Sequence, residues 1–314
     1  MLGRTANSLF WMFRYLERAE NTARLLEAGF RMALTRDLAT AEGEWRSVIE
    51  AAGRREDFER QNATYTGVQA WNFILRDSGN PMSVMDMLDA VRTNARAARN
   101  AISEELWTVI NESWMEIRDM MAKPVNQGQV GRVLGSIRRA GTLAHGAMVG
   151  SMLRDEGFHF ARAGTFLERA DSTARILDIK YYLLLPSLSY VGSSLDTGQW
   201  ENVLRSVAGD RVFSWLHAGR IDARSIVDFL VLDERFPRSL AFCHDALRQE
   251  LAALARIHKS EGQSNALMRQ ADIRLTEMTV EDIFEQGLHQ FLVDFKQSNT
   301  RIAEAIGQDY RFLV

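Results

Sequence analysis

One segment of a dozen residues occurs twice in this chain, and the repetition constrains the fold more than any other feature. Residues 15–26 read YLERAENTARLL, and residues 166–177 read FLERADSTARIL. Two shorter blocks recur in the same order, since residues 43–49 resemble 198–204 and residues 73–84 resemble 229–240. Ordered self-similarity of this kind indicates duplicated structural units. The sequence therefore predicts a tandem duplication of a roughly 150-residue unit.

Helical patterning runs along almost the whole chain. The only prolines are Pro81, Pro124, Pro186 and Pro237, and the stretches between them are rich in Ala, Leu, Arg and Glu, with apolar residues at helical spacing. This pattern predicts an all-α protein. We expect helices near residues 7–36, 42–53, 67–76, 83–99, 103–122, 129–150, 155–185, 198–208, 222–232, 238–258, 264–276 and 280–306.

The repeat also predicts how the helices are arranged. Residues 1–151 would form the first helical repeat and residues 152–314 the second, within one compact helical bundle. A pseudo-twofold axis would relate the repeats, with the long first helices of the two packed against each other at the seam. Ser83, Ser103 and Thr279 are expected to cap helix starts, and the Ser- and Gly-rich residues 186–198 to form an exposed connection.

The polar face of the repeated helix is the strongest candidate site. Placed at 100° per residue, its apolar side chains gather on one side and its acidic, basic and amide side chains on the other. Glu, Arg, Thr and the final Arg are unchanged between the copies, although a solvated face would be expected to diverge. The candidate residues are Glu17, Arg18, Asn21, Arg24, Glu168, Arg169, Ser172 and Arg175.

Two interpretations of these residues stay open. In the first, they pair across the seam, with Glu17 reaching Arg169 or Arg175 and Glu168 reaching Arg18 or Arg24, and so fix the register of the two helices. In the second, they line a shared cleft. There Arg would hold a carboxylate or phosphate, and Glu would hold an amine or act as a general base.

A metal site has weaker support. Glu156 and His159 form a Glu-x-x-His pair of the kind that helical di-iron sites contain, but such sites need two copies of it, and the first repeat has none. Solvated and packed side chains are the alternative, and we predict no cofactor.

Composition excludes several classes of function. The chain has 314 residues, a net charge of -3 and 38 basic residues dispersed among 41 acids, which argues against a nucleic-acid partner. The single cysteine, Cys243, excludes an intramolecular disulfide. Neither a leader peptide nor an apolar run of about 18 residues is evident, so we expect a cytoplasmic protein without a membrane partner.

At the doubled Leu-Glu-Arg-Ala block the chain resembles the alpha-E family, an all-helical bacterial family named for its Glu-Arg motif. The resemblance extends through residues 8–24, 91–96, 166–186 and 229–239 and covers nearly the whole chain. Residues 163–165 depart from the family pattern and leave no second-copy match to Arg14. Similar proteins are encoded beside, or fused to, ATP-grasp-like proteins, transglutaminase-like proteases and amidotransferase-like hydrolases.

The resemblance implies work on amide bonds in a small peptide-like product. We therefore expect an accessory protein, without catalytic activity of its own, that docks on an ATP-grasp-type amide ligase. The alternative is a helical enzyme or ligand-binding protein that uses the Glu/Arg-lined cleft. Self-association into a homo-oligomer is left open.

Overall fold

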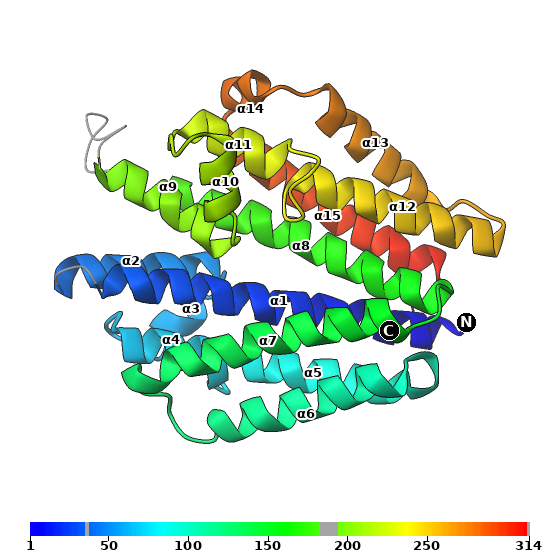
Figure 1. The fold of residues 1–314 in the computed structure, drawn as a ribbon, viewed down its shortest axis with the longest axis horizontal. Coiled ribbons are helices and arrows are strands. Elements are labelled where there is room, and N and C mark those ends of the chain that lie inside the picture. The colour runs from blue at the N-terminus through cyan, green and yellow to red at the C-terminus, as the bar shows by residue number, and fades with distance from the viewer. Residues whose placement is uncertain (35–37, 183–193, 313–314) are drawn as a thin grey trace.

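The computed structural model describes residues 1–34, 38–182 and 194–312, and all regular structure in these residues is helical (Figure 1). This confirms the all-α prediction. Most of the predicted connection at residues 186–198, including Pro186, lies outside the described residues, as does the predicted end of the helix at residues 155–185.

The first half of the chain contains α1 (Gly3–Ala33), α2 (Leu38–Ala51), α3 (Arg55–Glu59), α4 (Gly67–Arg76), α5 (Val84–Ala97), a 3-10 turn (Arg99–Ala101), α6 (Glu104–Met120) and α7 (Gln127–Ser151). The second half contains α8 (Glu156–Tyr182), α9 (Ser194–Ser206), α10 (Asp210–Leu216), α11 (Ala223–Val231), α12 (Leu240–His258), α13 (Gln263–Glu277), α14 (Val280–Gln286) and α15 (Leu288–Asp309).

Two parts of the helix prediction were wrong. The short helices α3 and α10 were not predicted, because five and seven residues are too few to show a helical period. The helix predicted over 280–306 is interrupted at Gly287, which adopts φ +91°, a conformation that favours glycine. The predicted caps are confirmed: the side chains of Ser83, Ser103 and Thr279 each accept a hydrogen bond from a backbone N–H in the first helical turn.

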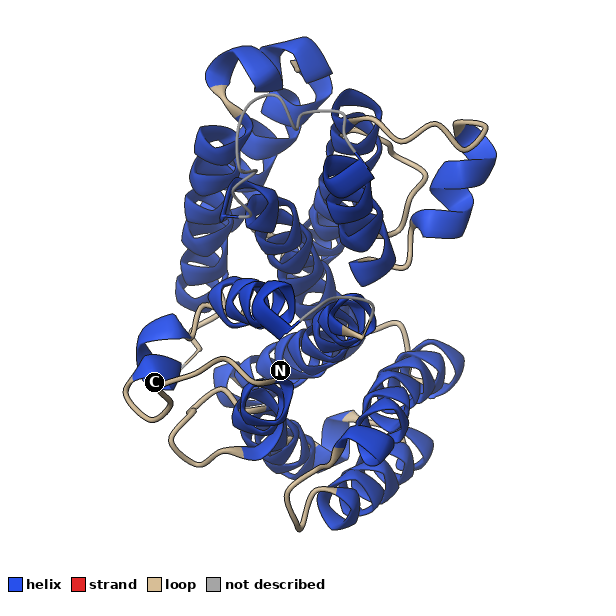
Figure 2. Ribbon diagram, turned by 90° about the vertical axis from the view of Figure 1, so that its left-hand side faces the viewer, coloured by secondary structure: helices blue, strands red, loops and turns tan. Residues whose placement is uncertain are grey.

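Helices α1 and α8 lie side by side through the middle of the molecule (Figures 1 and 2). Helices α5 and α7 pack on the other side of α1, and α12 and α15 pack on the other side of α8. Helix α2 contacts α8 as well as α1, and α9 contacts α1 as well as α8. Both central helices are therefore surrounded by other helices. The duplication and the pseudo-twofold axis remain predictions.

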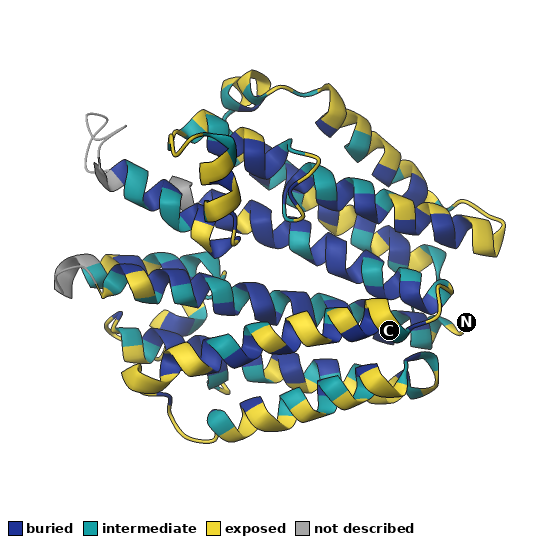
Figure 3. Ribbon diagram, viewed as in Figure 1, coloured by how far each residue is buried: buried dark blue, intermediate teal, exposed yellow. Residues whose placement is uncertain are grey.

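This arrangement buries α1 on both faces (Figure 3). Met12, Leu16 and Ala19, on the predicted apolar side, are at most 3% exposed. On the polar side Glu17 is 0% and Asn21 6% exposed, because that side faces α8 rather than solvent. Such burial requires that every charged group there have a partner.

Among the described residues, no helix has the length and apolar character needed to cross a membrane.

Candidate functional site

The carboxylate of Glu17 is completely buried where α1 meets α8. Arg169, on α8, donates to both of its oxygens, from Nε to Oε1 at 2.9 Å and from Nη2 to Oε2 at 2.9 Å. Arg238, in the turn before α12, donates from Nη1 to Oε1 at 3.1 Å. Nε2 of His145, on α7, lies 3.2 Å from Oε2. One carboxylate therefore connects α1 to two helices and to the turn before a third.

Arg238 extends this network along α1. Its Nη1 donates to Oδ1 of Asn21 at 2.6 Å, and its Nη2 donates to Oε1 of Glu20 at 2.8 Å. Asn21 in turn donates to Glu17 at 3.1 Å, and Arg24 donates to Glu20 at 2.8 Å. We refer to these residues as the Glu17 cluster: Glu17, Glu20, Asn21, Arg24, His145, Arg169 and Arg238.

A second buried carboxylate, Glu168 on α8, is 1% exposed. Arg18, on α1, donates to it from Nε to Oε1 at 2.5 Å and from Nη2 to Oε2 at 2.8 Å. Arg14 donates from Nε to Oε2 at 3.0 Å and lies 4.4 Å from the ring centroid of Trp11. Arg14, Arg18 and Glu168 form what we call the Glu168 cluster.

The two Glu-Arg dipeptides of the repeated segment, Glu17-Arg18 and Glu168-Arg169, are thus bound to each other. Glu17 of the first accepts from Arg169 of the second, and Glu168 of the second accepts from Arg18 of the first. Arg24 and Arg175 do not reach the opposite glutamate. They pair with acids on their own helices: Arg24 binds Glu20, and Arg175 binds Asp171 through Nε at 2.7 Å. The geometry is therefore that of reciprocal ion pairs across the α1–α8 contact.

Both glutamates are held ionised. Burial alone would raise the pKa of Glu17, but Arg169 and Arg238 lower it well below its ordinary value of 4.5. Burial also opposes ionisation of Glu168, yet Arg14 and Arg18 lower its pKa below the ordinary value. Burial alone would lower the pKa of Arg169, and Glu17 raises it. Neither carboxylate is poised to take up a proton near neutral pH.

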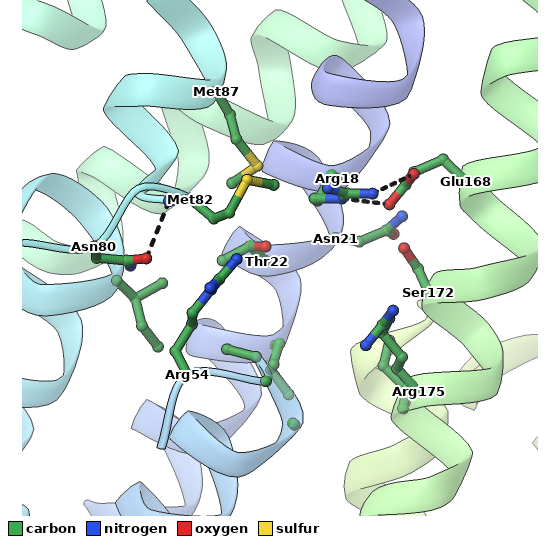
Figure 4. A pocket seen from close by; sticks show the side chains of 16 residues that line it. Arg18, Asn21, Thr22, Arg54, Asn80, Met82, Met87, Glu168, Ser172 and Arg175 are labelled. Carbon is green, nitrogen blue, oxygen red and sulfur yellow. Dashed lines mark hydrogen bonds and ion pairs between the residues drawn. The ribbon is translucent and has the colours of Figure 1, made fainter. Parts of the chain in front are cut away.

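A cavity of about 220 Å³ lies beside the Glu168 cluster, between α1, α8 and the loop after α2 (Figure 4). Arg18, Asn21 and Thr22 reach it from α1, and Glu168 and Ser172 reach it from α8. Its other polar lining includes Arg54, Asn80 and Arg175, and its apolar lining comprises Leu25, Ala51, Ala52, Ile74, Met82, Met87 and Ile176. Part of the candidate polar face is therefore open.

Several polar groups around this cavity have unused hydrogen-bonding capacity. The Arg54 guanidinium points into it in Figure 4 and, among the residues that the structure describes, binds only Asp57, from Nη1 at 3.3 Å. Arg175 uses Nε for Asp171 and turns its terminal nitrogens towards Ser172. The Ser172 side chain is buried, and no described residue hydrogen-bonds to its hydroxyl or to that of Thr22. The cavity thus presents guanidinium N–H groups and two free hydroxyls.

Sequence reasoning missed important members of both clusters. Arg238 and His145 complete the Glu17 cluster, Arg14 completes the Glu168 cluster, and Arg54 faces the cavity. Arg238 lies within residues 229–240, which resemble residues 73–84, and this recurrence was the one sequence feature that could have drawn attention to it. Nothing in the local pattern marks His145 or Arg54.

The structure separates the two candidate metal ligands. Glu156 contacts the N-terminal amine and Nε2 of His258, whereas Nδ1 of His159 lies 2.6 Å from Glu250. In the part of the chain that the structure describes, one group of three side chains lies close enough together to hold a metal ion: Glu17, Glu20 and His145. Its carboxylates already accept hydrogen bonds from Arg169, Arg238 and Arg24, and a cation would have to displace those guanidiniums. This donor set fits ion pairing better than metal binding.

The fold and these contacts define a class of protein: an all-helical protein whose two central helices exchange Glu-Arg ion pairs. The sequence matches the Alpha-E family, described as a predicted alpha-helical domain with a conserved ER motif, over residues 1–311. The chain belongs to this family. Glu17-Arg18 and Glu168-Arg169 are the Glu-Arg dipeptides at the centre of the structure.

The curated relatives include uncharacterized proteins of Mycobacterium bovis and Mycobacterium tuberculosis, each 24% identical to this chain over 269 residues. The matched region covers 80% of this chain but 30% of each relative, so the chain spans less than a third of their length. No solved structure matches.

Proposed function

We propose that this protein binds a small anionic ligand in the cavity between α1 and α8, and does so as the accessory partner of an ATP-grasp-type amide ligase. The observation that carries the binding proposal is the cavity itself. It brings together three arginines, two free hydroxyls and one carboxylate, from the polar faces of the two central helices and from the loop after α2.

The charge balance around the cavity favours an anion. Glu168 is matched by two guanidiniums, those of Arg14 and Arg18. Asp57 is likewise matched by two, those of Arg54 and Arg60. The ionisable side chains that line the cavity itself are three arginines, Arg18, Arg54 and Arg175, and one carboxylate, Glu168. A carboxylate or phosphate accepts guanidinium N–H groups in a bidentate manner, and such charge-assisted bonds are stronger than neutral ones.

The same contacts argue against a catalytic role for the glutamates. A general base needs a pKa near the working pH and a free oxygen in reach of the substrate. Glu168 has a lowered pKa, and both of its oxygens accept hydrogen bonds from arginines. We therefore favour binding over catalysis within this chain.

The ligase partner is supported by the family resemblance. In this proposal the cavity holds the anionic end of the acceptor or product, and the partner supplies ATP and the phosphoryl chemistry. An acceptor held by its carboxylate would keep the rest of the molecule free for amide-bond formation.

Binding can be tested by calorimetric titration of acetate and inorganic phosphate into the wild type, Arg54→Gln and Arg175→Gln. Both arginines are at the cavity rim, so the variants should fold normally and bind at least tenfold more weakly. Arg205→Gln, which removes an exposed arginine paired with Glu201, is the matched control. Unchanged binding in both cavity variants, or no binding by the wild type, would refute the proposal.

The partnership needs a separate test. The protein should co-purify with an ATP-grasp-type protein of the same organism and increase that protein's amino-acid-dependent ATP hydrolysis. The Arg175→Gln variant should still co-purify but lose the stimulation. Absence of both the complex and the stimulation would refute the partnership and leave the binding proposal intact.

A further inference from the structure

Two turns of similar sequence approach the central helices in different ways. Pro81-Met82-Ser83 leads into α5, and Pro237-Arg238-Ser239 leads into α12. In both, the serine side chain caps the helix, accepting from the backbone N–H of Asp86 or Phe242. The residue between the proline and the serine is a methionine in the first turn and an arginine in the second.

This difference decides whether space is left beside the glutamate. Arg238 extends to α1 and binds Glu17, Glu20 and Asn21, so its guanidinium occupies the space on that side. Met82 extends towards α1 from the first turn, and its uncharged side chain lines the cavity, with Arg18 between it and Glu168 in Figure 4.

The second guanidinium on Glu168 comes instead from Arg14, on α1. Residues 163–165 offer no counterpart of Arg14 on α8, because Thr165 stands at the corresponding position and donates to Ala161. Glu168 therefore has its two arginines without any contribution from the Met82 turn. No cation from within the cavity is therefore needed to neutralise the Glu168 carboxylate.

The walls of the cavity differ in character. Met82 and Met87 lie with their sulfur atoms close together on one side, and Leu25, Ile74 and Ile176 continue the apolar lining. Arg54 and Arg175 line another side of the cavity, below the methionines in Figure 4, and their side chains are 29% and 51% exposed. A cavity of about 220 Å³ holds more than a bare carboxylate, since one water occupies about 30 Å³ in the liquid.

We infer that the cavity is selective for a small carboxylate with a short hydrocarbon body, and that Met82 is the residue that sets this selectivity. This rests on the anion binding proposed above. The carboxylate lies between Arg54 and Arg175, and the hydrocarbon lies against Met82 and Met87. The flexible, unbranched methionine side chains suit an apolar surface of this kind.

Chain length provides the first test. Acetate, butanoate, 4-methylpentanoate and inorganic phosphate would be titrated into the wild type. Affinity should rise about fourfold for each methylene that becomes buried, and phosphate should bind no better than acetate. Equal affinity for all three carboxylates, or tighter binding of phosphate, would overturn this inference, although anion binding itself would stand.

Substitution of Met82 provides the second test. Met82→Arg places a long, charged side chain on the apolar side of the cavity and should abolish 4-methylpentanoate binding in the folded protein. Met85→Arg is the matched control, since Met85 is near in sequence but does not line the cavity. Met82→Ala should enlarge the cavity and shift the preference towards longer carboxylates.

If Met82→Arg does not fold, the chain-length preference of Met82→Ala still tests whether Met82 sets the selectivity. Retained binding in folded Met82→Arg, or an unshifted chain-length preference in Met82→Ala, would show that Met82 does not set selectivity. If Arg54→Gln and Arg175→Gln abolish anion binding but both Met82 variants bind carboxylates as the wild type does, the role assigned to Met82 is refuted and the anion-binding proposal stands.

Discussion

The Glu17 and Glu168 clusters begin from the same dipeptide and differ in how completely they are closed. Glu17 accepts from two arginines, an asparagine and a histidine that come from four parts of the chain. Glu168 accepts from two arginines of one helix and borders a cavity. The difference suggests that one ion pair holds the helices together, while the other also helps to form a binding site.

The largest effect should follow Glu17→Gln. The change leaves Arg169 buried without the carboxylate that it pairs with, and it removes one of the two carboxylates that Arg238 binds. Removing one partner of a buried ion pair typically costs about 3–5 kcal/mol of unfolding free energy. Urea unfolding would measure the loss. Glu27→Gln is the control, because the partially exposed pairs of Glu27 with Arg31 and Arg138 should contribute about 1 kcal/mol or less. A loss below 1 kcal/mol for Glu17→Gln would contradict an architectural role.

Glu168→Gln should destabilise less, by about 1–3 kcal/mol, a typical cost for leaving a buried group without its partner. Arg18 is 27% exposed and faces the cavity, so water can solvate it when the carboxylate is removed. The same urea experiment would compare the two variants directly. An equal or greater loss for Glu168→Gln would remove the distinction between the clusters.

Acid sensitivity should follow the same order. The pKa of each glutamate is lowered in the folded state, so each stabilises the protein above its unfolded pKa of about 4.5, and the contribution is lost as pH falls through the folded pKa. Stability of the wild type should therefore fall as the pH is lowered below 4.5. Glu17→Gln should flatten this decline more than Glu168→Gln, because Glu17 accepts hydrogen bonds from more groups than Glu168 does. If the unfolding free energy of the two variants fell equally steeply with decreasing pH, the proposed difference between the Glu17 and Glu168 clusters would be contradicted.

The smallest difference in unfolding free energy is expected between variants of Arg24 and Arg175, the last arginine of each repeated segment. Arg24 is 16% exposed and binds Glu20 inside the Glu17 cluster, whereas Arg175 is 51% exposed at the cavity. Arg24→Gln should cost about 1 kcal/mol, and Arg175→Gln about 0.2–0.5 kcal/mol, the usual contribution of a helical i,i+4 pair. Thermal unfolding would rank the two, and the reverse order would show that Arg175 has a structural role.

The sequence predicted the helices well where they are long and periodic. Residues 67–76 match α4, and the caps at Ser83 and Thr279 follow from local hydrogen bonding that the sequence specifies. The break at Gly287 was missed because the apolar period continues through it, and only the backbone conformation reveals the interruption.

The site was less predictable, because it depends on contacts between distant segments. Reading the helix face identified Glu17, Glu168 and the arginines that follow them, since those residues belong to one repeated pattern. Which pairs form depends on how α1 and α8 cross, and the pattern left two choices for each glutamate. Met82 and His145 reach the site from other elements, so no feature of the repeated helix could indicate them.

The most direct test of the account is the gain in unfolding free energy that saturating 4-methylpentanoate produces in Glu17→Gln and in Glu168→Gln. The gain in Glu17→Gln should equal that of the wild type, because the cavity does not border Glu17. In Glu168→Gln it should be larger, because the loss of the Glu168 charge leaves the cavity lining more positive and so favours the added carboxylate. A larger gain in Glu17→Gln, or the same gain in both variants, would contradict the assignment of the ligand cavity to the Glu168 side.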